Sequence, residues 1–229
     1  MHATVITFPG SNREHDVARA LRKAGAKVTM GWHADHDLPA GTDLVVLPGG
    51  FSYGDYLRCG AIASRANIME ATRKHAERGG MVLGICNGFQ IACEAGLLPG
   101  VLMRNSQIRF ICRLQHLKVE RTDTPYTSAY TAGDVIEVCV AHGEGNWIGD
   151  AETLKRIEGD GRVAFRYCDA SGALVANPNG STNAIAGIYS ENRRVLGLMP
   201  HPENLIEPLT GGTDGLGMFK SLAGAMAAA

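Results

Sequence analysis

The chain has 229 residues, of which 45% are hydrophobic, and its formal net charge is −1. This length suits one α/β domain with a large buried core, and we expect residues 1–229 to form a single domain. The small net charge and the lack of a basic run argue against a protein that binds nucleic acid or an anionic membrane.

The six cysteines are scattered along the chain, and none belongs to a C-x-x-C pair. The first residues lack the basic and long apolar regions of a signal peptide, and no stretch is long enough to span a bilayer. We therefore expect reduced cysteines and a cytoplasmic protein. No cysteine or histidine pair has the spacing of zinc ligands, so the sequence predicts no metal site in this chain.

The first part of the chain alternates between strand and helix patterns. Residues 4–8 are an apolar run, and residues 13–24 carry apolar side chains at helical spacing. Further strands are predicted at 27–30 and 44–47, followed by a long amphipathic helix at 62–78. This order predicts an α/β fold with a parallel, doubly wound sheet, and such sheets bind ligands at the carboxyl ends of their strands.

The most informative stretch is residues 81–92, where an apolar strand pattern changes to helical spacing at Cys86. Gly84 and Gly88 flank this cysteine at minus two and plus two, as in the sharp strand-to-helix turns that expose a nucleophile. The positive end of the following helix would favour a thiolate. The alternative is that Cys86 is an ordinary buried small side chain.

The second part of the chain has the character of an antiparallel insertion followed by a return to the main sheet. Polar turns such as Asp123-Thr124-Pro125 join strand-like runs there, and the chain closes with a helix. The predicted strands are residues 101–119, 135–141, 162–167, 185–189 and 195–199, and the predicted helix is 215–228.

Two further features fall at the carboxyl ends of predicted strands. Gly49 and Gly50 could turn backbone N–H groups toward a developing negative charge, although an ordinary glycine turn is the alternative. His201 and Glu203 could form a base and the group that orients it, leaving one imidazole nitrogen for the sulfur of Cys86. The alternative for this second pair is a polar loop without chemistry.

At these residues the chain resembles a known family. Residues 84–90 and 199–203 resemble the motifs of class I, triad-type glutamine amidotransferases. Residues 8–12, 48–55 and 177–181, with Arg104-Asn105 and His142-Gly143-Glu144-Gly145, are similar to the glutaminase subunits of phosphoribosylformylglycinamidine synthases. The likeness covers essentially the whole chain. It implies a flavodoxin-like, mostly parallel sheet with helices on both faces and an added antiparallel insertion.

The resemblance also implies roles for individual residues. Cys86 would be the nucleophile, His201 the general acid and base, and Glu203 the residue that orients His201. The backbone N–H groups of Gly50 and Asn87 would form the oxyanion hole. The residues expected to bind L-glutamine are Gly49, Gln90, Arg104, Asn105, His142 and Gly143.

The chain has no G-x-x-x-x-G-K-[ST] loop and no evident place for ATP, so we expect no cofactor in it. The resemblance implies that ammonia passes to a large synthetase subunit that holds ATP, magnesium and formylglycinamide ribonucleotide, sometimes with a small third subunit. A glutaminase subunit of another synthetase, such as the anthranilate or imidazole glycerol phosphate enzymes, is one alternative. A stand-alone cysteine hydrolase and a non-enzymatic interaction module are the others.

Two positions depart from the pattern of the family. Arg13 stands where many relatives have a cysteine, and Asn204 stands where an arginine often follows the Pro-His-Pro-Glu segment. Neither position belongs to the predicted triad, and both are expected to affect contacts with a partner.

Overall fold

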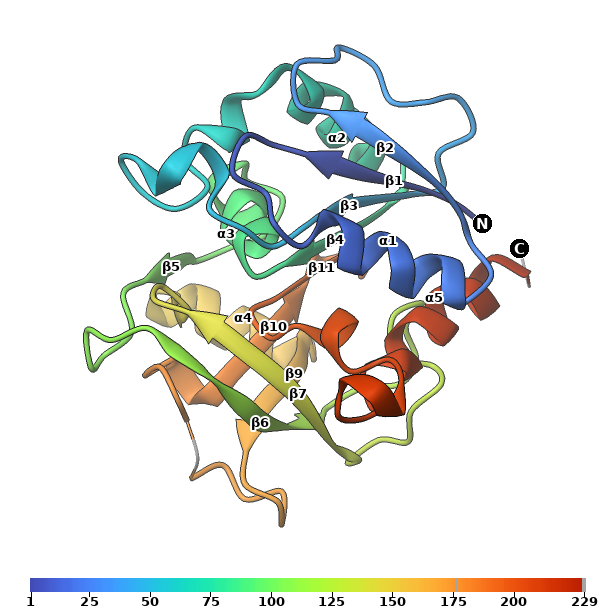
Figure 1. Ribbon diagram of the computed structural model, residues 1–229. Coiled ribbons are helices and arrows are strands. Elements are labelled where there is room, and N and C mark those ends of the chain that lie inside the picture. The colour runs from blue at the N-terminus through green and yellow to red at the C-terminus, as the bar shows by residue number, and fades with distance from the viewer. Residues whose placement is uncertain (176, 228–229) are drawn as a thin grey trace.

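A mixed sheet runs through the molecule, with the strand order β2-β1-β3-β4-β11-β10-β9-β6-β7 (Figure 1). The computed structural model describes residues 1–175 and 177–227. The strands of this sheet are β1 (His2–Thr7), β2 (Lys27–Trp32), β3 (Leu44–Leu47), β4 (Met81–Ile85), β6 (Ile111–Val119), β7 (Val135–His142), β9 (Val163–Cys168), β10 (Ile185–Tyr189) and β11 (Val195–Leu198).

Helices cover both faces of the parallel half of the sheet. The helices α1 and α5 contact each other on one face, whereas α2 and α3 pack on the other (Figure 1). The α-helices are α1 (Glu14–Lys23), α2 (Asn67–Glu77), α3 (Asn87–Glu94), α4 (Ala151–Gly159) and α5 (Leu216–Ala227). Short 3-10 turns lie at Ser52–Asp55, Ala63–Arg65, Thr182–Ala184, Pro202–Asn204 and Pro208–Thr210.

The strands β2, β1, β3, β4 and β11 are paired in parallel. Their order is the flavodoxin-like one, as the sequence predicted. Every residue of β3 and β4 is buried, as expected for parallel strands covered on both faces. Because β3, β4 and β11 are neighbours that run in the same direction, the segments that follow their last residues emerge side by side at one edge.

The antiparallel strands β10, β9, β6 and β7 continue the same sheet beyond β11, so the predicted insertion widens the sheet rather than lying beside it. The single strand expected over residues 101–119 is two strands. β5 (Val101–Met103) pairs instead with β8 (Asn146–Ile148) in a separate ribbon. The chain leaves the strand conformation after Met103 because the Asn105 side chain bonds to backbone groups and closes a loop.

Two helices differ from the sequence-based expectation. The helix expected over residues 62–78 begins only at Asn67, because Ala66 is extended with ψ 150° and separates it from a 3-10 turn. The helix α4 was not predicted at all. Its first turn is capped by Asp150, whose side chain accepts a hydrogen bond from the Thr153 N–H at 2.7 Å. An acidic residue three positions before a threonine was the local signal for this start.

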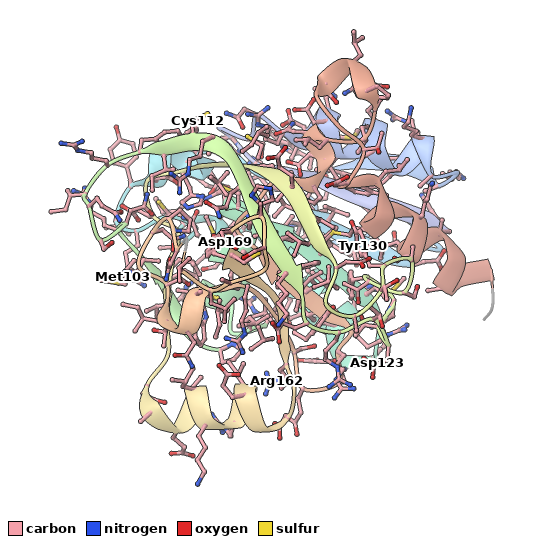
Figure 2. All side chains as sticks on the ribbon, turned by 90° about the horizontal axis from the view of Figure 1, so that it is seen from below. Met103, Cys112, Asp123, Tyr130, Arg162 and Asp169 are labelled. Atoms are coloured by element: carbon pink, nitrogen blue, oxygen red, sulfur yellow. The ribbon has the colours of Figure 1, made fainter. Side chains whose placement is uncertain are left out.

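The long segment between β6 and β7 lies at the end of the antiparallel half that is opposite Met103 and Cys112, as the positions of Asp123 and Tyr130 show (Figure 2). Tyr126 anchors this segment to the parallel strands. Its ring is fully buried, and its hydroxyl lies 2.9 Å from the carbonyl oxygen of Val82 and 2.6 Å from that of Arg194. One phenolic proton thus serves two buried carbonyl groups at the amino ends of β4 and β11.

Replacing this hydroxyl tests how much the anchor contributes. Tyr126→Phe should lower the free energy of unfolding by about 1–2 kcal/mol, because the Val82 and Arg194 carbonyls lose the phenolic hydrogen bond, while the bond from the Val82 N–H to the Arg194 carbonyl remains. Urea denaturation followed by circular dichroism measures this change. Tyr56→Phe is the matched control, since Tyr56 is 74% exposed, and it should leave the stability unchanged. Equal stability of the two variants would show that the Tyr126 hydroxyl does not hold the segment in place.

Candidate active site

Cys86 occupies the turn between β4 and α3, with φ 51° and ψ −107°. This conformation is rare for any residue with a side chain, and it persists only where the surrounding structure imposes it. The N–H of Cys86 donates to the Leu198 carbonyl of β11 at 2.8 Å. Its Sγ lies 3.8 Å from the Ala141 carbonyl oxygen of β7. The sulfur is therefore held between the parallel and the antiparallel halves.

The flanking glycines are required by close backbone approach. A Cβ on Gly84 would lie 2.6 Å from the carbonyl oxygen of Gly88, and a Cβ on Gly88 would overlap the carbonyl of Leu47. Because α3 begins directly over β3 and β4, no side chain fits at either position. The sequence-based prediction of a sharp strand-to-helix turn around Cys86 is thus confirmed as a feature of the backbone.

His201 follows β11 and faces Cys86 across the same sheet edge. Its backbone N–H donates to the Cys139 carbonyl of β7 at 2.8 Å. Its Nδ1 lies 2.7 Å from Oε1 of Glu203, and both side chains are at most 2% exposed. The other ring nitrogen, Nε2, is buried, and the Cys86 side chain lies within hydrogen-bonding reach of the ring. The predicted orientation of His201 by Glu203 is present, and one nitrogen remains for a reacting group.

The charge state of His201 follows from its neighbours. Burial by itself lowers its pKa, but the negative charges of Glu203 and of the Cys86 sulfur outweigh this effect and hold the pKa well above its usual value. An imidazolium in this position can accompany a thiolate and can give a proton to a leaving group.

Asn87 directly follows Cys86, and Gly50 lies in the segment after β3, the strand that pairs with β4; their role as oxyanion donors stays a prediction. Gly50 has φ 152°, and a Cβ there would lie 2.7 Å from the carbonyl oxygen of Gly10. It forms an isolated antiparallel bridge with Ser11. The flanking bonds, Phe51 N to Gly10 O at 2.9 Å and Asn12 N to Gly49 O at 3.3 Å, leave the N–H of Gly50 itself directed away from Ser11. Asn87 opens α3, and the first N–H groups of a helix have no acceptor within it.

Gly49 and Gln90, two of the residues expected to bind glutamine, contact different parts of the candidate triad: Gly49 lies against the His201 ring, and the Gln90 N–H donates to the Cys86 carbonyl at 3.2 Å. A Cβ on Gly49 would be 2.8 Å from Cε1 of His201, so only glycine fits beneath the imidazole. The amide oxygen of Gln90 accepts a hydrogen bond from the Asn87 side chain at 2.9 Å, and its Nε2 donates to the Glu144 carbonyl at 2.6 Å. Gln90 thus links α3 to the loop that follows β7.

Arg104 and Asn105 lie on the other side of that loop and differ in their surroundings. Arg104 is largely exposed, and its Nε lies 3.5 Å from Oε1 of Glu144. The Asn105 side chain is buried and fully engaged: it donates to the His142 and Arg109 carbonyls at 2.9 and 2.8 Å and accepts from Gly145 N–H at 3.0 Å. These bonds give Asn105 a structural role, and its contact with glutamine stays a prediction.

His142 is buried beside a polar cluster that the sequence did not reveal. Its Nε2 lies 3.1 Å from the Nδ2 donor of Asn179, which also bonds to the Gly145 carbonyl and to the hydroxyl of Tyr167. Burial, together with the charge of His201, lowers the pKa of His142 to about 3. His142 is therefore neutral, and its Nδ1 is buried with no hydrogen-bond partner among the described residues. Gly143, the next residue, accepts from the Asn105 N–H at 2.9 Å.

Asp55 and Cys59 form a second unpredicted group near the entrance of the site. Burial raises the pKa of Asp55. Burial and the adjacent carboxylates of Asp55 and Glu144 raise the pKa of Cys59 far above its usual value. Cys59 is therefore a protonated thiol, unlike a nucleophile. All six cysteines are free.

The two unusual positions of the sequence meet at one carboxylate. Nη1 of Arg13 lies 3.1 Å from Oδ2 of Asp16, and Nδ2 of Asn204 lies 3.5 Å from the same oxygen. Asn204 directly follows Glu203, and the Arg13 side chain packs against Gly49. Both departures therefore lie beside the candidate triad rather than on a distant surface.

The described part of the chain offers neither a group of metal ligands nor a membrane-spanning helix. In residues 1–175 and 177–227, no three His, Cys, Asp or Glu side chains are grouped so that they could hold a metal ion. Of the helices described, none has the length and apolar character needed to cross a membrane.

Comparison with known proteins identifies the family. A family model described as a CobB/CobQ-like glutamine amidotransferase domain matches residues 1–212. The chain therefore belongs to the glutamine amidotransferase family, as the sequence motifs predicted.

Individual relatives narrow this class. The phosphoribosylformylglycinamidine synthase subunit PurQ of Bradyrhizobium diazoefficiens is 62% identical over 226 residues, which cover 97% of each chain. The protein of the same name from Rhodopseudomonas palustris is 63% identical over 225 residues, again with 97% of each covered. A chain in the structure of PurLQS from Thermotoga maritima superimposes with a TM-score of 0.88 at 42% identity, over 98% of both chains.

The protonation of His201 gives a test of the site's electrostatics. In an NMR titration of the imidazole ring, Glu203→Gln should lower the pKa of His201, because the variant loses a buried negative charge. With its raised pKa, protonated His201 stabilises the folded state fully below the unfolded pKa of about 6.5. That contribution is lost as the pH rises through the raised folded pKa, and Glu203→Gln should reduce it.

Glu207→Gln provides the matched control for this titration. Glu207 lies in the same C-terminal segment, but it pairs with Arg19 and Lys23 at 2.9 and 3.3 Å rather than with His201. It should leave the His201 titration unchanged. If both substitutions shift the pKa of His201 equally, or if neither shifts it, the specific pairing of Glu203 with His201 is contradicted.

Proposed function

We propose that this chain is the glutaminase subunit of a phosphoribosylformylglycinamidine synthase, and that it releases ammonia from L-glutamine for a synthetase subunit in purine biosynthesis. The observation that carries the proposal is the meeting of Cys86 with the buried His201–Glu203 pair at one sheet edge. Identity of about 60% to PurQ proteins over nearly the whole chain supports this synthetase rather than another.

The reaction begins with attack of the Cys86 thiolate on the side-chain amide carbon of glutamine. The carbonyl π bond opens, and the negative charge on oxygen is met by the N–H groups of Gly50 and Asn87. The protonated His201 gives its proton to the amide nitrogen, the carbon–nitrogen bond breaks, and ammonia leaves. The product bound to the enzyme is a glutamyl thioester.

His201, now neutral, completes the cycle as a base. It takes a proton from water while the oxygen adds to the thioester carbon, and the same two N–H groups stabilise the second oxyanion. The carbon–sulfur bond then breaks, which releases glutamate and restores the thiolate beside the imidazolium. Glu203 keeps Nδ1 of His201 bonded at 2.7 Å throughout, so that Nε2 always faces the reacting atoms.

The glutamine side chain is held by the groups that surround these atoms. Gly49 leaves room beneath the His201 imidazole, and Gln90 and His142 offer neutral polar groups. We propose that the amino-acid end of glutamine is held by Arg104 with the Asn105 loop and Gly143. In this arrangement Asn105 positions backbone rather than bonding to the substrate through its side chain.

The consumption of ammonia is assigned to partners. We propose that the large synthetase subunit holds ATP and magnesium, that this chain carries no cofactor of its own, and that a small third subunit completes the assembly. The relative from Thermotoga maritima was solved as PurLQS, which supports an assembly. Six free cysteines fit a reducing compartment, and we propose a cytoplasmic location.

Removal of the sulfur separates the two half-reactions. In the complex with the synthetase subunit, Cys86→Ala should abolish synthesis that depends on glutamine and should spare synthesis from added ammonium. Cys112→Ala, at an exposed cysteine, is the control and should retain both activities. Measurement of product formation with each nitrogen source decides the matter, and glutamine-dependent turnover by Cys86→Ala would disprove the assignment of the nucleophile.

The coupling between subunits has its own test. The synthetase subunit should raise the rate of ammonia release from glutamine well above that of the isolated chain, because Cys86 is only 6% exposed in the isolated chain. A coupled glutamate assay with and without the synthetase subunit measures this effect. Equal rates would refute activation by the partner.

A further inference from the structure

We propose that two loops, residues 51–58 and 104–110, form the surface that binds the synthetase subunit, with Leu57 and Ile108 as its two apolar contact points. This inference rests on the proposed function, because it assigns the partner of the same active site. Both loops project from the same side of the molecule, at the left in Figure 1. They are named here the first and the second docking loop.

Large apolar side chains are concentrated at the tips of the two docking loops. Leu57 is 87% exposed and Ile108 is 75% exposed, and Phe51, Tyr56 and Phe110 are also exposed. Single exposed apolar residues are normal on any protein surface, but five on two loops of the same side are typical of an interaction site.

The backbone at both tips is in a conformation that the exposed side chains disfavour. Leu57 has φ 70° and Ile108 has φ 55°. For a branched side chain such as that of isoleucine, a positive φ is a rare outlier, and it costs on the order of 1–2 kcal/mol. In the free chain this cost is not offset by burial of the side chain. A partner that covers Leu57 and Ile108 would supply the missing burial.

Both docking loops are held from below by residues of the active site. In the first loop, the Ser52 N–H donates to Oδ1 of Asn87 at 3.1 Å, and Nδ2 of Asn87 lies 3.5 Å from Asp55. In the second loop, Asn105 bonds to the backbone of His142 and Gly143. The tips are thus presented on a rigid base rather than on free chain.

The charged residues of the docking loops indicate the chemistry of the partner. Arg58, Arg104 and Arg109 lie in the two segments, Asp55 is their one acidic residue, and neither segment contains lysine. Aromatic residues and arginine are enriched at protein interfaces, whereas lysine is depleted there. Arg58 pairs with Glu94 and Arg104 with Glu144, so Arg109 is the one of the three with no ion pair to the described residues, and the surface fits a mainly apolar pocket of the partner.

The position of the loops also suits delivery of ammonia. The first loop directly follows Gly50, and Glu144 lies near both loops: it is 3.5 Å from Arg104 of the second loop, and its charge acts on Asp55 of the first. A partner seated on both tips would cover the active site, so that ammonia from Cys86 leaves beneath it rather than into bulk water. A displacement of the first loop on binding would also shift Gly50 and Asn87, the proposed oxyanion donors.

Substitution of the two tips tests this surface. Leu57→Asp and Ile108→Asp place a charge in the apolar contact, while aspartate tolerates a positive φ better than most residues. Calorimetric titration of the full chain with the synthetase subunit should show binding weakened at least about tenfold by each variant and about a hundredfold by the pair. The glutaminase activity of the isolated chain should be unchanged.

Leu209→Asp is the matched control. Leu209 is 93% exposed in the turn Pro208–Thr210, outside both docking loops, and this variant should bind the synthetase subunit as the unmodified chain does. If an aspartate variant lowers the melting temperature, Leu57→Gly and Ile108→Gly remove the same side chains while relieving the backbone, and they should weaken binding similarly.

The outcomes separate this proposal from the proposed function. If the unmodified chain binds and is activated, but the Leu57 and Ile108 variants bind with unchanged affinity, the docking surface is wrong and the function stands. Equal weakening by Leu209→Asp would also overturn the surface. If the unmodified chain neither binds the synthetase subunit nor is activated by it, the proposed function itself fails.

Discussion

The parallel pairing of β3, β4 and β11 is the constraint on which the candidate active site depends. Leu47 pairs with Gly84, and Ile85 pairs with Leu198, so the three strands end almost level. Gly50, Cys86 and His201 therefore all follow strands that end at one edge of the sheet. A slip of one residue in β4 would invert its side chains between the two faces and remove the turn that presents Cys86.

The antiparallel half of the sheet completes this edge rather than merely extending it. The Cys139 carbonyl of β7 holds the backbone of His201, and the Ala141 carbonyl lies beside the sulfur of Cys86. The loop after β7 then carries Glu144, which binds Gln90 through its backbone. Cys86 and His201 thus follow parallel strands, and the antiparallel strands help to bury them.

Two buried histidines in this site have opposite protonation states for clear physical reasons. Burial alone makes any histidine neutral, and His142 follows that rule because Asn179 offers only a neutral partner. His201 is equally buried, yet the charges of Glu203 and Cys86 reverse the effect. The site can therefore keep a protonated His201 beside the sulfur, and the second histidine, His142, stays neutral and does not add a second positive charge.

The sequence by itself determined the parts of this protein that depend on local chemistry. The glycines around Cys86, the apolar strands of the parallel sheet and the His201-Pro202-Glu203 segment each carried a pattern that could be read without coordinates, because backbone crowding and strand burial restrict residue type at each position. Only the tertiary structure decided which distant groups meet. Asn179 against His142, Asp55 and Cys59 against Glu144, and Asn105 as a brace are contacts between segments far apart in the chain, and polar loop residues have no periodicity that would reveal their partners. The exposure of Leu57 and Ile108 was likewise decided by the fold. An apolar side chain is expected to be buried, and only the tertiary structure shows that these two are not.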